Sequence, residues 1–176
     1  MELIQLKPAH VDARGSITDL ISDDEINAVT SIGCDDPSET MERAAAIQKI
    51  RSSADFEAVS MAFKRIKNIL KQAEAGAAEG SLADIATEGL EPAEASLLEF
   101  LSNAKLKIEK LERSRKYLKI LETMAGGRPA IDQFFEKIMV MHQDPSIKKR
   151  RLVLLGNLFA TFSRVADISE IVVTKS

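Results

Sequence analysis

The sequence predicts an all-α protein, a helical bundle of about six helices. Apolar residues recur at alternating steps of three and four along several segments, and no segment alternates apolar and polar residues as a strand does. The hydrophobic content of 45% in 176 residues is enough for one core. Proline is favoured in the first turn of a helix. Four prolines lie where an apolar-periodic segment begins: Pro37, Pro92, Pro129 and Pro145.

The first half of the chain contains three candidate helices. We expect residues 1–21 to form a loosely ordered N-terminal segment, because they show no clear pattern. Ser22 then begins a capping box, and Asp36 precedes Pro37 at the start of the second helix. The third helix is predicted over residues 53–72. Its apolar stripe contains Phe56, Val59, Phe63, Ile66 and Leu70.

Residues 73–92 separate the two helical halves of the predicted domain, which spans residues 22–176. This stretch is rich in Ala, Gly and Glu, with few bulky apolar side chains and a local excess of acid. Such a composition buries little apolar surface on folding. We therefore expect a mobile acidic insertion, with at most one short turn near residues 82–85.

The second half begins with a long predicted helix from Pro92 to Gly126. Its apolar residues keep a heptad-like spacing with one skipped position at Arg115. A short two-helix coil fits residues 97–121, but the pattern lasts barely four heptads, so a helix within a bundle is favoured. The glycine pair Gly126-Gly127 ends the helix.

Two further helices complete the prediction. Phe134, Phe135, Ile138, Met139 and Met141 give a short helix an apolar surface wide enough to be almost wholly buried. A long last helix follows, in which an aspartate caps a proline at the first helical position. Its apolar face contains Leu152, Leu155, Phe159, Phe162 and Ala166. The bundle is expected to close around six rings: Phe63, Phe100, Phe134, Phe135, Phe159 and Phe162.

Charge is distributed unevenly, although the net charge is only −3. Residues 1–96 carry 9 basic and 18 acidic side chains, and residues 97–176 carry 15 and 9. The run Lys148–Arg151 places four cations at the start of the last helix, where they oppose the helix dipole. An anion is the natural partner of such a site, and a solvated basic turn is the alternative.

The third predicted helix carries a second set of cations. Lys64, Lys67 and Lys71 fall on a common side, with Arg65 and Asn68 on the other flank of the polar surface. An Asn side chain can read base edges, whereas a solvated Lys-rich face is the plainer interpretation.

No stretch of the sequence indicates catalysis. Nucleophile elbow, P-loop, zinc-ligand spacing and dinucleotide fingerprint are all missing, and a single cysteine, Cys34, excludes an internal disulfide. No run of 18 apolar residues is long enough to span a membrane. We expect the chain alone to catalyse nothing, to hold no cofactor or metal, and to be cytoplasmic, because its start lacks a signal pattern.

Two stretches, AGGRPAIDQFFEKIMVMHQD and RLVLLGNLFATFSRVADIS, closely resemble the end of the β subunit of bacterial glycyl-tRNA synthetase. A third, AFKRIKNIL, resembles a recurring signature of the same family. That end of the β subunit is a helical anticodon-binding domain, related to that of arginyl-tRNA synthetase. The resemblance covers residues 25–171. It implies that the chain grips the anticodon loop of glycine tRNA and does no chemistry.

The resemblance also implies partners. They are tRNA, the remainder of the β subunit, and the α subunit, on which ATP and glycine react. Cations would neutralise phosphates, and amide or guanidinium groups would read splayed bases. The candidate tRNA-binding residues are Lys64, Arg65, Asn68, Lys71, Lys148, Lys149, Arg150, Arg151 and Asn157. The alternatives are a helical-bundle protein-interaction module, or a free-standing homologue that binds another RNA.

Overall fold

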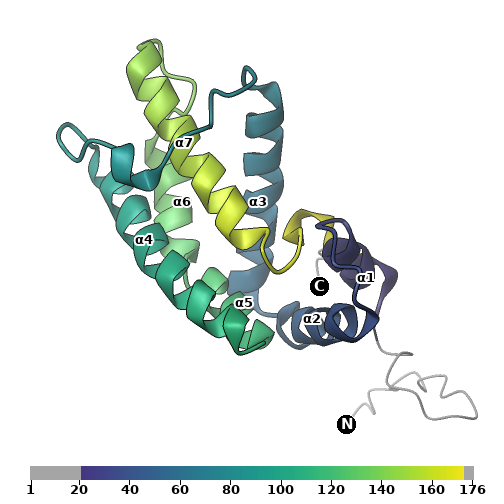
Figure 1. Ribbon diagram of the computed structural model, residues 1–176. Helices are drawn as coiled ribbons and strands as arrows, with labels where there is room; N and C mark the ends of the chain where they lie inside the picture. The colour runs from purple at the N-terminus through teal and green to yellow at the C-terminus, as the bar shows by residue number, and fades with distance from the viewer. Residues whose placement is uncertain (1–20, 173–176) are drawn as a thin grey trace, which may run out of the picture.

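The computed structural model describes residues 21–172, which form seven α-helices and two short 3-10 helices, with no strand in that range (Figure 1). The all-α prediction is confirmed. The expected loose segment lies outside the described residues, apart from its last residue. The elements are α1 (Asp23–Thr30), α2 (Pro37–Ile50), α3 (Ala54–Gln72), η2 (Leu82–Asp84), α4 (Pro92–Arg113), α5 (Tyr117–Ala125), α6 (Arg128–Lys137), α7 (Pro145–Phe162) and η3 (Ile168–Glu170).

The helices begin where the predicted caps stand. The Ser22 amide donates to the Glu25 carboxylate over 3.0 Å, which is the return bond of the capping box. The side chains of Asp36 and Asp144 accept hydrogen bonds from the first amides of α2 and α7. All four helix-initiating prolines occupy the first or second helical position.

The long helix expected from Pro92 to Gly126 is two helices, so this prediction was wrong. Arg115 adopts a left-handed backbone with φ of 52°, and the amide of Lys116 donates to the carbonyl of Leu111 over 3.0 Å. The chain folds back there, and α5 packs against both α4 and α2. The Arg115 guanidinium contacts Glu39 at 3.3 Å. The skipped heptad position therefore marks a break in the helix.

The prediction for residues 134–141 was also partly wrong. Helix α6 ends at Lys137, and the next residues are extended, so their side chains alternate between core and solvent. Ile138 and Val140 are buried, whereas Met139 is 69% and Met141 41% exposed. Similarly, α7 ends at Phe162, and Ala166 is buried beyond the helix.

The phenylalanine core holds α3 against α7. The Phe63 ring lies 4.5 Å from the Phe159 ring and 6.2 Å from the Phe162 ring, and Phe100 meets Phe162 edge to face at 6.5 Å. The two helices run in opposite directions, so the C-terminal end of α3 and the N-terminal end of α7 lie at the same end of the bundle (Figure 1). This arrangement brings the two predicted cationic segments toward each other.

The segment between α3 and α4 packs along α7. Helical Gly156 leaves room for it, since a Cβ there would lie 2.8 Å from the Ala78 carbonyl oxygen. The Asn157 amide donates to the Gly80 carbonyl over 2.9 Å, and Ile85 is buried. The predicted short turn is η2. The mobility of this acidic insertion stays a prediction. No helix in the described range is long and apolar enough to cross a membrane.

Candidate nucleic-acid interface

The basic run at the start of α7 divides into two pairs with different environments. Arg150 and Arg151 both bind the carboxylate of Glu94, in the first turn of α4, at 3.0 Å and 3.2 Å. Arg151 is 2% exposed; it also donates to the Met139 carbonyl over 2.8 Å and pairs with Glu91. These contacts tie the start of α7 to the start of α4, so the Arg151 guanidinium is not free to bind phosphate.

Glu94 is the centre of this buried cluster. Burial raises its pKa, but hydrogen bonds from Arg150 and Arg151 outweigh this effect and hold the pKa below its ordinary value. The Glu94 carboxylate also accepts a hydrogen bond from the amide of Glu91 over 3.0 Å, which is the return bond of the capping box at the start of α4. A buried carboxylate thus compensates two of the four cations that oppose the α7 dipole.

Lys148 and Lys149, the other pair, have no ion-pair or hydrogen-bond partner for their ammonium groups within residues 21–172. Lys148 is half-buried and Lys149 is exposed. They are the cations of the run that can accept an anionic ligand without breaking an existing contact.

The cations of α3 are divided in the same way. The Lys64 ammonium donates to the Ile171 carbonyl over 2.8 Å, and Lys67 pairs with Asp167 at 2.5 Å and Glu170 at 3.0 Å. Both lysines therefore hold the C-terminal segment, and only part of the predicted lysine face is open. Asp167 also caps η3, because its side chain accepts a hydrogen bond from the Ser169 amide.

The remaining predicted residues of α3 are exposed. The Arg65 guanidinium lies 4.2 Å from the centre of the Phe135 ring and makes no ion pair among the described side chains. Asn68 and Lys71 have no side-chain hydrogen bond in that same part of the chain. Asn157, by contrast, uses its amide group on the carbonyls of Gly80 and Val153, each at 2.9 Å. The role of all nine residues in tRNA binding stays a prediction.

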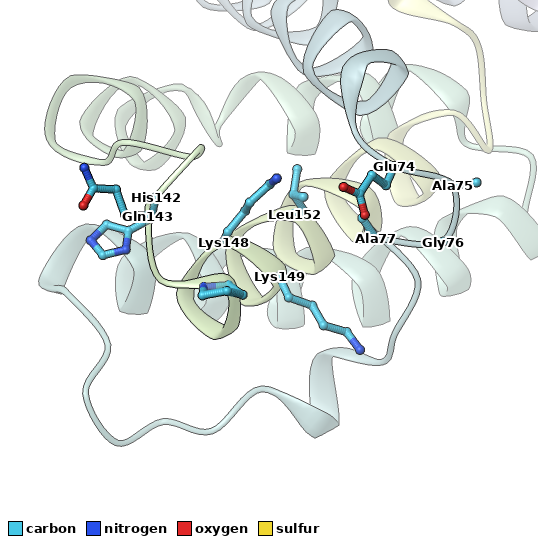
Figure 2. A pocket seen from close by; sticks show the side chains of 10 residues that line it. Glu74, Ala75, Gly76, Ala77, His142, Gln143, Lys148, Lys149 and Leu152 are labelled. Atoms are coloured by element: carbon cyan, nitrogen blue, oxygen red, sulfur yellow. The ribbon is translucent and has the colours of Figure 1, made fainter.

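A hollow of about 540 Å³ lies between the segment that follows the C-terminal end of α3 and the N-terminal end of α7 (Figure 2). Residues 74–77 form one wall, the loop 142–145 forms the other, and the first turns of α7 form the floor with Lys148, Lys149 and Leu152. Figure 2 shows Lys148 extending toward the wall that carries Glu74, while Lys149 points in another direction. The hollow thus offers ammonium, carboxylate, imidazole and amide groups beside the apolar side chain of Leu152.

Sequence reasoning missed three residues of this hollow. Glu74 follows the end of α3 in a stretch expected to be a mobile connection, and Gln143 lies in a turn. His142 lies in the same turn, and its Nδ1 atom accepts a hydrogen bond from the Asp144 amide over 3.0 Å. No local pattern pointed to the hollow, because its walls come from separate parts of the chain. No cluster of possible metal ligands is found in residues 21–172.

Fold and charge together define a class, the all-α module with unpaired cations gathered at one end of a bundle. Within that class, residues 59–173 match the DALR anticodon binding domain family, and the chain belongs to this family. The match runs from Val59, within α3, through η3, and it therefore includes both cationic segments and the hollow.

The chain is also similar to proteins named glycine–tRNA ligase beta subunit. It is 44% identical over 153 residues to the one from Acidobacterium capsulatum, covering 85% of this chain and 22% of the relative. The identity is 36% over 156 residues with that of Desulfatibacillum aliphaticivorans and 31% over 162 with that of Geobacter metallireducens. These alignments cover 85% and 90% of this chain, and 21% and 23% of the relatives. The chain thus spans about a fifth of the length of the curated relatives it matches.

Proposed function

We propose that this chain is the tRNA anticodon-binding part of a glycine–tRNA ligase β subunit, and that it grips the anticodon loop of glycine tRNA. The observation that carries the proposal is the family match over both cationic segments, together with unpaired lysines at the end where α3 and α7 meet. Anticodon loops present phosphates and unstacked bases in one place, which suits such a surface.

Binding requires contacts of two kinds. Lys71 and Lys149 neutralise backbone phosphates, which contributes affinity that depends on salt and not on sequence, and the Lys148 ammonium adds a further contact to the loop. Arg65 and Asn68 lie on the outer surface of α3 and supply a guanidinium and an amide that can contact sugar, phosphate or base edges. Arg150 and Arg151 act indirectly, because they fix the start of α7 through Glu94.

The larger assembly is part of the same proposal. The remainder of the β subunit and an α subunit are the protein partners, and aminoacylation takes place on the α subunit, with ATP and glycine as its substrates. In this proposal the chain itself forms no bond, holds no cofactor and works in the cytoplasm, where translation takes place.

The test is the binding of an RNA hairpin with the glycine anticodon stem and loop, measured by fluorescence anisotropy against salt concentration. The variant Lys148→Gln/Lys149→Gln should lose about one unit of salt slope per phosphate contact, and about tenfold in affinity at moderate salt. The matched control is Lys105→Gln/Lys107→Gln on α4, whose ammonium groups also have no partner in the described structure. Equal slopes for the wild type and the Lys148/Lys149 variant would refute the proposed grip.

The competing proposal, a protein-interaction bundle, rested largely on a charged heptad helix over residues 97–121. That helix is interrupted at Arg115, so it offers no continuous coiled-coil seam.

A further inference from the structure

We infer that the hollow between residues 74–77 and 142–149 binds one unstacked cytosine of the anticodon, with Glu74 and Lys148 reading its Watson–Crick edge. This inference rests on the proposed function, and it names the base and the side chains that select it.

The first support is the state of the polar groups in the hollow. Neither the Glu74 carboxylate nor the Lys148 ammonium has a hydrogen-bond or ion-pair partner in the described part of the chain, although both line the same hollow. The buried charges of Glu94 and Arg151, by contrast, are paired with each other. An acceptor and a donor are thus held ready across a space that can admit a ligand (Figure 2).

The second support is chemical complementarity. The edge of cytosine carries an amino donor at N4 beside ring acceptors at N3 and O2, and a carboxylate is a natural acceptor for the N4 amine. With N4 facing Glu74, the ring acceptors face the Lys148 ammonium. Uracil carries O4 in place of the amine, so that oxygen would face the Glu74 carboxylate, acceptor against acceptor, and leave the carboxylate without the hydrogen bond it makes to cytosine. Codons for glycine begin with two guanines, so every glycine anticodon contains two cytosines.

The third support is that both walls make contacts that position them. The wall that carries Glu74 continues into the segment held on α7 by the close approach of Ala78 to Gly156 and by the Asn157 hydrogen bond to Gly80. The opposite wall is held by the hydrogen bond between the Asp144 amide and His142. Leu152 and Pro145 supply apolar surface for the base, and the exposed Lys149 can meet the flanking phosphate.

The experiment measures base preference with the full chain. Hairpins carrying the glycine anticodon are compared with hairpins in which each shared cytosine is replaced in turn by uracil or by guanine. The wild type should prefer cytosine over uracil by about tenfold at one of the two positions. Glu74→Gln should bind the cytosine and uracil hairpins equally, because an amide offers both a donor and an acceptor.

The matched control is Glu79→Gln. Glu79 is an exposed acid of the same segment, but it lines a different hollow with Gly80 and Val153. This variant removes the same charge and should keep the wild-type preference, which separates base reading from a change in overall charge.

The outcomes separate the two proposals. If the wild type binds none of the hairpins, the proposed function fails, and this inference fails with it. If the wild type binds the hairpins but discriminates at neither position, prefers guanine, or keeps its preference in Glu74→Gln, this inference alone is overturned.

Discussion

Lys148–Lys149 and Arg150–Arg151 are neighbours in one basic run, yet the structure uses them in opposite ways. The arginines point into a cluster with Glu94, which is 1% exposed, while the lysines have no partner in the described residues. The guanidinium can make several hydrogen bonds in one plane, which suits burial, whereas an ammonium group on a flexible stem stays hydrated. A basic run is therefore not one functional unit, and burial decides which of its members can meet a ligand.

The largest effect is expected when the contacts of Arg150 and Arg151 with Glu94 are broken. Glu94→Ala removes the buried carboxylate shared by Arg150 and Arg151 and leaves Arg151 with only the half-exposed Glu91 as a carboxylate partner, so we expect the free energy of unfolding to fall by about 3–5 kcal/mol. Lys148→Ala should change it by no more than about 0.5 kcal/mol, since its ammonium group has no partner to lose. Urea unfolding followed by circular dichroism measures both values. Similar losses for the two variants would mean that the arginine pair and the lysine pair contribute equally to stability.

Acid should also weaken the contacts of Arg150 and Arg151 with Glu94. The folded pKa of Glu94 lies below its ordinary value near 4.5, so its contribution is complete above about pH 4.5 and is lost as the pH falls through the folded pKa. Glu39 adds to the loss, because hydrogen bonds from Arg43 and Tyr117 lower its pKa to about 2. We expect the melting temperature to fall below about pH 4.5 and to fall less steeply in Glu94→Gln.

The matched control for acid is Glu74→Gln, which removes an exposed carboxylate without a partner in the described structure. It should follow the wild-type acid profile. An equally flattened profile in this control would show that general charge, and not the Glu94 cluster, sets the acid response.

The same comparison between a paired and an unpaired cation can be made within α3, where the expected effect is smaller. Lys67→Ala removes the partner of the buried Asp167 and should cost about 1–3 kcal/mol, whereas Lys71→Ala should cost no more than about 0.5 kcal/mol. The order should reverse for RNA affinity, where Lys71→Ala weakens binding and Lys67→Ala acts only through stability. Thermal unfolding and hairpin binding at a temperature where both variants are folded give the two orders.

Much of the fold could be predicted from local sequence, because the signals that begin helices are local. Asp36, Asp144 and the four prolines are caps and first-turn residues whose effect needs no distant partner. The break at Arg115 was harder to see, since its side chain is paired with acids of α2, far away in the chain.

The candidate site was predictable only in part. The sequence located the cations of α3 and α7, but the fate of Arg151 depends on Glu94, which lies 57 residues earlier. The exposure of Met139 and Met141 follows from α6 ending at Lys137, which no glycine or proline signals. The hollow joins residues 74–77 to residues 142–149, and a contact of that kind leaves no periodic trace in a single sequence.

The most direct test is a lysine-acetylation footprint of the full chain, read by mass spectrometry with and without the glycine anticodon hairpin. Lys71, Lys148 and Lys149 should lose reactivity when RNA binds, while Lys105, Lys107 and Lys110 on α4 keep theirs. Protection of the α4 lysines, with Lys148 and Lys149 still fully reactive, would place the RNA elsewhere and contradict a binding site where α3 and α7 meet.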